Sequence, residues 1–248
     1  KLMEISVVIP LYNAAQYVTE AVQSVLSQPE TREVILVEDG SQDESFSRCQ
    51  VLAGSDSRVK LLTHDGRRNL GASASRNLGI LNAKYDYIAF LDADDFYLPS
   101  RFKSAREVFA RNEGVEGVYE AIGTHFESEE ASRVWKKLGH PLLTTIRAGI
   151  SSESLFEAQS PIGNAGHCSL DGLTVKRDVF NKTGLFDVDL NIGEDTAFLM
   201  KLAACARLLP GEVERPVAMR RVHANNTVTR PRAAGAVWRD ELAVRLSV

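Results

Sequence analysis

Short apolar runs alternate with stretches of helical periodicity through the first half of the chain, and this alternation limits the folds open to it. The apolar runs cover residues 5–9, 33–37, 59–62 and 87–91. The stretches that follow them, with apolar residues at helical spacing, cover residues 15–26, 41–53, 72–83 and 98–112. Strands that alternate with helices predict βαβ units and a mostly parallel sheet. Because the strands are apolar on both sides, we expect helices on both faces of the sheet.

The second half of the chain has a weaker pattern. Residues 118–122, 173–176 and 217–222 are predicted strands, and residues 196–207 are a predicted helix. Residues 125–170 show no clear period and are expected to form a loop with short helices. Residues 233–246 are weakly amphipathic. No internal repeat or linker interrupts the sequence, so one domain with an irregular second half is the simplest interpretation.

Charge, apolar content and cysteine usage exclude several classes of protein. The 29 basic and 33 acidic residues leave a net charge of −4, which speaks against a broad basic surface for nucleic acid. No apolar run approaches the ~18 residues needed to span a bilayer, and the first residues lack the apolar core of a signal peptide. The three cysteines lie far apart, so we expect neither disulfides nor a thiolate zinc site. A cytoplasmic protein fits these features best.

Acidic residues gather where two of the predicted parallel strands end. Glu38 and Asp39 follow the second strand, and Asp92, Asp94 and Asp95 follow the fourth. One such cluster would be explained by ordinary turns and helix caps, but ligands of open α/β sheets bind at the carboxyl ends of the strands. Neighbouring carboxylates repel one another without a counter-charge, and a hard cation such as Mg²⁺ or Mn²⁺ suits their oxygens. Because Mg²⁺ often binds through carboxylates together with substrate phosphates, the pattern predicts a phosphate-bearing ligand.

Two common nucleotide-binding motifs are absent from the sequence. It contains no GxxxxGK[ST] loop and no GxGxxG after the first strand, which disfavours P-loop and dinucleotide-binding domains. Residues 69–79 instead present the start of a helix to the predicted crevice, with Arg76 and Asn77 as a cation and an amide. For Arg76, a solvated helix charge paired with a carboxylate is an equal alternative.

Five motifs stand together in an order that resembles glycosyltransferase family 2. They are Val8-Ile-Pro-Leu-Tyr-Asn13, Val37-Glu-Asp-Gly-Ser41, Ala74-Ser-Arg-Asn-Leu-Gly79, Phe90-Leu-Asp-Ala-Asp-Asp95 and Gly193-Glu-Asp195. The resemblance extends over roughly residues 4–227. It implies the GT-A fold, an α/β class with a Rossmann-like, mostly parallel sheet flanked by helices and a smaller irregular acceptor-side half. It also implies an inverting enzyme that uses a nucleotide-sugar donor.

The resemblance implies a role for most residues of the first four motifs. The residues that it assigns to the nucleotide sugar are Pro10, Tyr12, Asn13, Glu38, Asp39, Arg76, Asp92, Ala93 and Asp94. The first three would line the nucleoside pocket, and the next two would contact the base and ribose. Asp92-Ala93-Asp94 resembles the DxD motif of the family, with Asp94 or Asp95 on a divalent cation, Mn²⁺ or Mg²⁺, and Asp92 nearer the ribose.

The second half of the chain would supply the base and the acceptor contacts. By resemblance, Asp195 is the catalytic base, with Glu194 on the acceptor side. His167 precedes the predicted strand that faces the acceptor, where it either contacts the acceptor or packs in the core. The alternative for Glu194 and Asp195 is an acidic first helical turn that complements the helix dipole. His223 stands in a segment where relatives often carry a histidine near the metal or the diphosphate, although a structural histidine is the alternative.

The resemblance also implies a domain plan and a set of partners. Residues 1–230 would form a single GT-A domain, with a nucleotide-binding half at 1–115, an acceptor-binding half at 116–230 and a helical tail at 231–248. The expected donor is a UDP- or dTDP-sugar, and the expected acceptor is a glycan, a lipid-linked compound or another hydroxyl compound. No nucleic acid and no membrane span are expected, and peripheral contact with the inner face of the membrane stays open.

Two other functions remain as alternatives. A catalytically inactive sugar-nucleotide-binding protein would keep the same fold, although the acidic residues speak against it. A sugar-phosphate nucleotidyltransferase has a related architecture but should carry a Gly-rich, basic loop after its first strand. This chain has Pro10-Leu-Tyr-Asn-Ala-Ala15 at that place.

Overall fold

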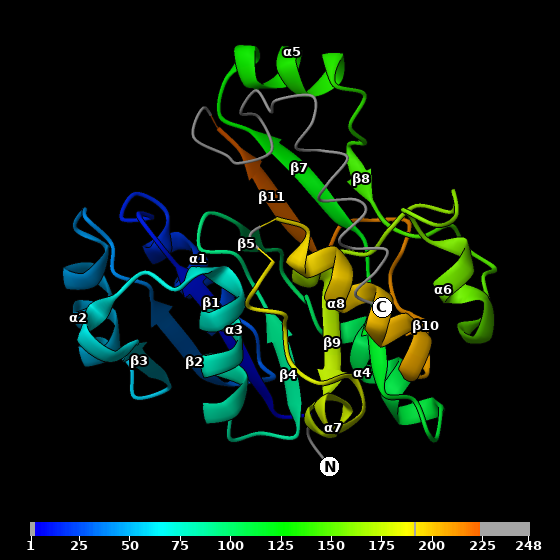
Figure 1. The fold of residues 1–248 in the computed structure, drawn as a ribbon, viewed down its shortest axis with the longest axis horizontal. Coiled ribbons are helices and arrows are strands. Elements are labelled where there is room, and N and C mark those ends of the chain that lie inside the picture. The colour runs from blue at the N-terminus through cyan, green and yellow to red at the C-terminus, as the bar shows by residue number, and fades with distance from the viewer. Residues whose placement is uncertain (1–2, 191, 224–248) are drawn as a thin grey trace.

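The computed structural model describes residues 3–190 and 192–223, and in this part the predicted alternation of strands and helices is confirmed (Figure 1). The elements of the first half are β1 (Ile5–Leu11), α1 (Val18–Leu26), β2 (Thr31–Glu38), α2 (Ser45–Ser55), β3 (Val59–Thr63), α3 (Gly71–Asn82), β4 (Tyr87–Phe90) and α4 (Lys103–Arg111). The expected helix over residues 98–112 starts only at Lys103, because Ser100 has a φ of 64° and cannot belong to a right-handed helix. The predicted tail lies outside the described residues.

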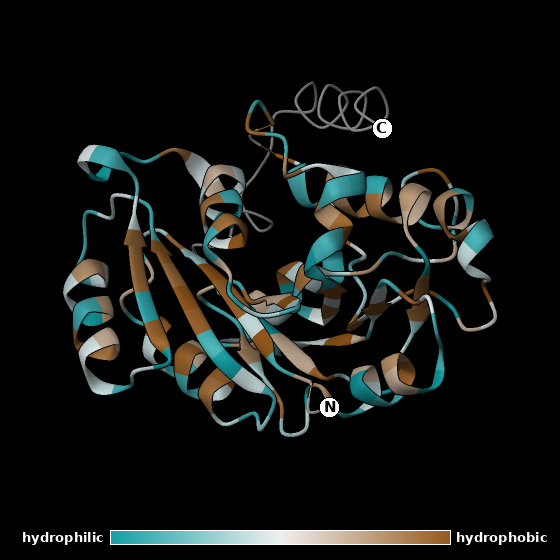
Figure 2. Ribbon diagram, turned by 90° about the horizontal axis from the view of Figure 1, so that it is seen from below, coloured by the Kyte–Doolittle hydropathy of each residue, from teal (hydrophilic) through white to brown (hydrophobic). Residues whose placement is uncertain are grey.

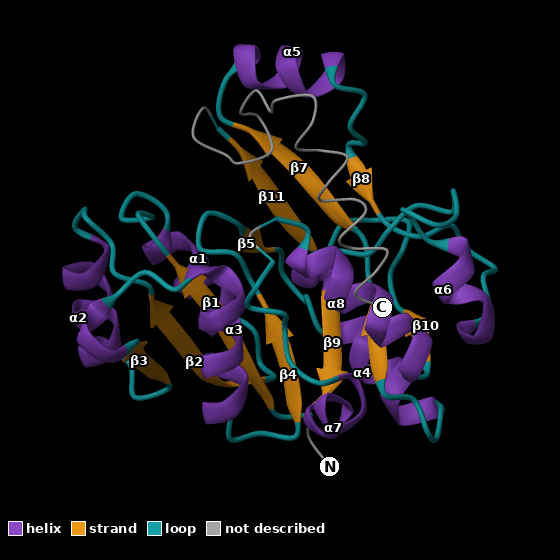
Figure 3. Ribbon diagram, viewed as in Figure 1, coloured by secondary structure: helices purple, strands orange, loops and turns teal. Residues whose placement is uncertain are grey.

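The larger sheet has seven strands in the order β10-β6-β9-β4-β1-β2-β3 (Figure 3). Its further strands are β6 (Gly117–Tyr119), β9 (Leu173–Lys176) and β10 (Leu208–Pro210). β9 runs antiparallel to both β4 and β6, while the other neighbours are parallel. The predicted α/β class with a mostly parallel sheet is therefore confirmed.

Both faces of the larger sheet are buried, as the apolar strands predict. Val8 of β1 stands beside Ile35 of β2 and Phe90 of β4, and these three side chains share one core cluster with residues of α3 and of α8 (Glu194–Cys205). The neighbouring residues Val7 and Leu36 belong to a second cluster, which includes residues of α1. Figure 2 shows the central strands as largely hydrophobic between flanking helices. The alternation of side chains along each strand thus divides the core into two layers.

A second sheet of four strands rises beside the first, in the order β5-β11-β7-β8 (Figure 1). Its strands are β5 (Phe96–Tyr97), β11 (Ala218–Val222), β7 (Ile122–Phe126) and β8 (Leu143–Thr144). The predicted single strand over residues 118–122 is wrong, because β6 ends at Tyr119 in one sheet and β7 begins at Ile122 in the other. β5 comes from the first half of the chain and pairs with β11 from the second half, so the two halves interlock.

Helices in the second half are short, apart from α5 (Glu129–Lys137) and α8. The Ser128 hydroxyl accepts the N–H of Ala131, Glu129 and Glu130 stand in the first turn of α5, and lysines end it. These are ordinary helix-start and helix-stop signals within the stretch that we expected to be mainly loop. The remaining short helices are α6 (Leu155–Ala158) and α7 (Phe180–Thr183).

A buried ion pair anchors the turn between β6 and β7, where the chain passes from the larger sheet to the second sheet. The side chains of Arg101 and Glu120 are both fully buried and form an ion pair. The Arg101 guanidinium also donates to the carbonyl oxygens of Asp171 and Leu173, at 3.0 and 3.3 Å. Glu120 lies in the turn between β6 and β7, so this pair anchors the point at which the chain leaves one sheet for the other.

Candidate active site

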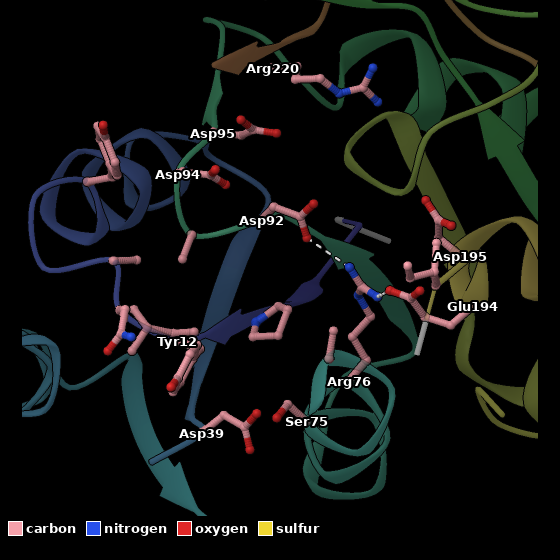
Figure 4. Close-up of a pocket in the computed structure, with 18 of the residues that line it drawn as sticks. Tyr12, Asp39, Ser75, Arg76, Asp92, Asp94, Asp95, Glu194, Asp195 and Arg220 are labelled. Atoms are coloured by element: carbon pink, nitrogen blue, oxygen red, sulfur yellow. Dashed lines mark hydrogen bonds and ion pairs between the residues drawn. The ribbon is translucent and has the colours of Figure 1, made fainter. Parts of the chain in front are cut away.

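A pocket of about 440 Å³ opens at the carboxyl ends of β1 and β4, where an α/β sheet is expected to bind its ligand. Its walls come from the turn after β1, Asp39 after β2, the acidic loop at residues 92–95 after β4, the first half of α3, the beginning of α8, and the end of β11 (Figure 4). The lining residues that the sequence had singled out are Pro10, Tyr12, Asn13, Asp39, Arg76, Asp92, Ala93, Asp94, Asp95, Glu194, Asp195 and His223. The fold therefore brings residues from both halves of the chain to one crevice.

The turn after β1 forms the wall on which Tyr12 stands. Tyr12 is 49% exposed, and Asn13 adopts a left-handed backbone conformation with a φ of 50°. The Asn13 side-chain oxygen accepts the N–H of Gln42, and its own N–H donates to the Ser41 hydroxyl, at 2.8 and 2.9 Å. These bonds tie the turn to the Glu38-Asp39-Gly40-Ser41 segment and leave the Tyr12 ring accessible to a ligand.

Asp39 and Glu38 differ in their relation to the pocket. Asp39 lines it, and its carboxylate accepts the N–H groups of Leu70 and Gly71 at 2.8 and 2.9 Å, which holds the beginning of α3. Burial raises the pKa of Asp39. Glu38 is fully buried, accepts the N–H of Ser41 and pairs with Arg67, and it is not among the lining residues. The structure therefore places Glu38 behind the turn, where it supports the backbone instead of facing a ligand.

Arg76 joins the two halves of the pocket. Its side chain is only 6% exposed, and its two terminal nitrogens pair with Asp92 at 3.0 Å and with Glu194 at 3.1 Å (Figure 4). Burial disfavours its charge, but the Asp92 and Glu194 carboxylates outweigh that and raise the pKa of Arg76. Burial and the nearby Asp195 charge raise the pKa of Glu194. Arg76 is thus a buried cation between carboxylates, and Glu194, expected on the acceptor side, is held by it.

The acidic loop contains a cluster that the sequence did not reveal. Carboxylate oxygens of Asp92, Asp95 and Asp171 lie within 4.8 Å of one another. The Asp171 carboxylate accepts the N–H of Asp92 at 3.0 Å, and the Asp95 carboxylate accepts the N–H of Arg221 at 2.7 Å. Burial and the nearby Asp171 charge raise the pKa of Asp95 well above its ordinary value, and burial together with Asp92 raises the pKa of Asp171 to about 6. No local signal marks Asp171 in the sequence.

Asp94 and His223 meet on the wall of the pocket. The Nε2 atom of His223 lies 3.0 Å from a carboxylate oxygen of Asp94, and the imidazole stacks on the ring of Tyr17 at 4.8 Å. The Arg221 guanidinium donates to the main-chain oxygen of Asp94 at 2.8 Å, which holds the loop in place. The structure therefore brings together Asp94 and His223, two of the residues that the sequence associated with a metal. The third, Asp95, is buried, and one oxygen of its carboxylate accepts a backbone N–H.

Asp195 lies across the pocket from Asp94, in the first turn of α8 (Figure 4). Its side chain is exposed, and one carboxylate oxygen accepts the N–H of Thr196 at 2.7 Å. Gly193 precedes the helix with a φ of 80°, which lets the chain turn sharply into it. His167, also expected on the acceptor side, is not among the residues that line the pocket.

The two sheets and the pocket at the strand ends form a GT-A fold, as the likeness to solved structures shows. A solved structure of S. aureus TarS residues 1–349 in complex with UDP-GlcNAc is similar over 99% of this chain and 66% of its own, with a TM-score of 0.72 and 15% identity. The mannosyltransferase PcManGT from Pyrobaculum calidifontis, in complex with GDP-Man and Mn²⁺, is similar over 97% of this chain and 61% of its own, with a TM-score of 0.58 and 19% identity.

The sequence comparisons identify the family. The model of Glycosyl transferase family 2 matches residues 6–156, and the chain belongs to this family. The minor teichoic acid biosynthesis protein GgaA of Bacillus subtilis is 28% identical over 204 residues, which are 79% of this chain and 42% of GgaA. The glycosyltransferase GlyG of Streptococcus pneumoniae is 41% identical over 92 residues, 37% of this chain and 30% of GlyG. The chain thus spans less than half the length of these relatives. Among the described residues, none of the helices has the length and apolar character to cross a membrane.

Proposed function

We propose that the chain transfers a sugar from a nucleoside-diphosphate sugar to an acceptor hydroxyl, with inversion at the anomeric carbon. The observation that carries this proposal is the placement of Asp195 across one pocket from Asp94 and His223. In a single displacement, Asp195 takes the proton of the acceptor hydroxyl while the oxygen of that hydroxyl bonds to the anomeric carbon. The bond from that carbon to the diphosphate breaks on the opposite face. Base and diphosphate sites must therefore face one another across the sugar.

The donor side of the proposal follows from the lining residues. Tyr12 offers an accessible ring on which the nucleobase of the donor can stack, and Asp39 lines the same wall of the pocket. The Arg76–Asp92 pair lies between this wall and α8. We assign a UDP- or dTDP-sugar as the donor; the UDP-GlcNAc bound by the similar TarS structure supports the first of these. The acceptor we propose is a glycan, a lipid-linked compound or another hydroxyl compound of cell-envelope polysaccharide or glycoconjugate synthesis, in line with the name of GgaA. The reaction would take place in the cytoplasm or at the inner face of the membrane.

A divalent cation, Mn²⁺ or Mg²⁺, fits the Asp94–His223 wall. A carboxylate oxygen and an imidazole nitrogen stand side by side there; the carboxylate oxygen suits Mn²⁺ or Mg²⁺, and the imidazole adds a nitrogen ligand. A bound cation would neutralise the charge that grows on the leaving diphosphate. One Asp95 oxygen accepts the Arg221 N–H, and Asp95 also offers a carboxylate oxygen within 4.8 Å of oxygens of Asp92 and Asp171, so it could add a ligand on the other side of the same loop.

Nucleotide binding should depend on the divalent cation. The pocket is lined by six carboxylate side chains, those of Asp39, Asp92, Asp94, Asp95, Glu194 and Asp195, which would repel a diphosphate. We expect UDP to raise the melting temperature in Mn²⁺ and to have little effect in a chelator. Calorimetry of UDP in both buffers gives the affinities. Equal affinity in the chelator would contradict the metal assignment.

The Asp94→Asn variant should weaken UDP binding in Mn²⁺ by roughly 10–100-fold, the range typical of lost metal-site partners. Asparagine keeps the size of the side chain but removes the charge. In the chelator the variant and the wild type should bind UDP equally. Asp65→Asn, an exposed carboxylate outside the pocket, is a matched control. If the Asp94 variant bound UDP in Mn²⁺ with wild-type affinity, the cation would have to be assigned to other carboxylates.

Reaction products separate this proposal from its alternatives. A transferase given a UDP-sugar without acceptor should slowly release UDP and free sugar. An inactive binding protein would bind the donor without turnover, and a nucleotidyltransferase would release pyrophosphate from UTP and a sugar phosphate. As a domain plan we propose one catalytic domain over residues 1–230, with nucleotide-binding (1–115) and acceptor-binding (116–230) halves and a tail at 231–248.

A further inference from the structure

Two arginines line the pocket in the described part of the chain, and they differ in their partners. Arg76 is neutralised by two carboxylates, as described above. Arg220 donates to the hydroxyl oxygen of Thr144 at 3.4 Å, and within residues 3–190 and 192–223 no carboxylate lies within 4.0 Å of its guanidinium. Arg220 therefore brings a positive charge to the pocket wall without the carboxylate partners that Arg76 has.

The neighbouring Arg221, unlike Arg220, is paired with carboxylates. Alternate residues of a strand face opposite sides, so Arg220 and Arg221 of β11 point apart. Arg221 pairs with Glu20 at 2.6 Å and with Glu127 at 3.6 Å, and it lies over the ring of Tyr17. Consecutive arginines of one strand thus have separate tasks: Arg221 holds the acidic loop, and Arg220 faces the pocket.

Arg220 lies on the side of the pocket where the acceptor would arrive. In Figure 4 its side chain extends from β11 toward the side of Asp195, away from Tyr12 and Asp39. Burial lowers the pKa of His167, and the Arg220 charge lowers it further. Arg220 therefore stands near β8, through Thr144, and near His167, which also feels the charge of Asp195.

We propose that Arg220 forms an anion subsite that takes a phosphate or carboxylate group of the acceptor, next to the hydroxyl that reacts. This inference rests on the proposed function, because it assumes that the acceptor reaches Asp195. A guanidinium presents five N–H donors in a planar fork that matches phosphate and carboxylate oxygens. Among the described residues, the hydrogen bond of the Arg220 side chain is the long one to Thr144. The Arg220 charge also acts on the Asp171 carboxylate, where it lowers the pKa that burial raises, but no described carboxylate forms an ion pair with Arg220, so its guanidinium can still pair with an anion of the acceptor.

The test uses the protein saturated with UDP and Mn²⁺, so that the diphosphate site is filled, and titrates glycerol 3-phosphate and glycerol in parallel by calorimetry. We expect glycerol 3-phosphate to bind and glycerol not to bind. Arg220→Gln should weaken glycerol 3-phosphate binding by roughly 10–100-fold, the worth of hydrogen bonds to a charged group. Arg220→Lys should lose less, since it keeps the charge. Arg215→Gln removes an exposed arginine that is not among the lining residues and should change nothing.

Each other outcome contradicts a specific statement. Equal binding of glycerol 3-phosphate to the wild type and to Arg220→Gln would overturn the subsite. Weaker UDP binding by Arg220→Gln would place Arg220 on the donor diphosphate, and a selective loss of UDP-glucuronic acid relative to UDP-glucose would place the anion on the donor sugar. If the wild type failed to bind UDP at all, the proposed function and this inference would both fall. Normal UDP binding without a response to glycerol 3-phosphate would overturn this inference alone.

Discussion

Replacing Asp195 with asparagine should lower the rate of sugar transfer by roughly 10²–10⁴-fold, the usual worth of a positioned general base. Asparagine has nearly the same size and can still accept the N–H of Thr196, so α8 should begin as before. It cannot take a proton from a hydroxyl at neutral pH. Donor affinity should stay nearly unchanged, because Arg76 is held by Glu194 and Asp92, and neither is altered.

Two measurements on the same purified variant separate the possible roles of Asp195. Calorimetry gives the donor affinity, and the release of UDP gives the turnover. If Asp195 were only part of an acidic first turn, asparagine would serve almost as well and turnover would barely change. A loss of donor binding as large as the loss of rate would place Asp195 on the donor instead. Asp189→Asn, an exposed carboxylate in the preceding loop, is a matched control.

The Arg101→Met variant should lose about 3–5 kcal/mol of unfolding free energy, the cost of leaving one partner of a buried ion pair uncompensated. Glu120 would then remain fully buried beside an apolar side chain, and the carbonyl oxygens of Asp171 and Leu173 would lose a donor. Urea denaturation measures the loss. Because Asp171 supports the acidic loop through the N–H of Asp92, UDP affinity in Mn²⁺ should fall as well.

A double variant and a surface control make this prediction sharper. Arg101→Met combined with Glu120→Leu removes both charges and should recover a large part of the lost stability. Arg215→Met removes the exposed partner of Glu212 and should cost no more than about 1 kcal/mol. A cost of the Arg101 variant as small as that of the Arg215 variant would show that the buried pair does not stabilise the fold.

Much of the first half of the fold could be predicted because its signals are local. Apolar runs of four to eight residues and helical periodicity lie within single segments, and the parallel strands of a βαβ unit follow one another along the chain. The motifs after β1, β2 and β4 could be located for the same reason, since they stand directly at strand ends. The carboxyl ends of parallel strands then meet at one edge of the sheet, which is why the expected pocket forms there.

The second sheet could not be predicted, because its strands are short and pair with distant segments. β5 and β8 have two residues each, too few to show a period, and β11 pairs with β5 from the other half of the chain. Asp171 shows the same limit. Its carboxylate reaches Asp92 because β9 runs antiparallel to β4 and brings Leu170–Gly172 beside the acidic loop.

The sequence by itself determined the class of fold, the order of the strands and helices in the first half, and the residue types that the pocket contains. Only the tertiary structure decided which of these side chains face the pocket and which support it from behind. Glu38 and Asp39 are neighbours in the sequence, yet Glu38 is buried behind the turn and accepts a backbone N–H, while Asp39 lines the pocket; Asp94 meets His223 on the wall. Burial and partners follow from packing between segments far apart in the chain, and a local pattern of residues does not encode that packing.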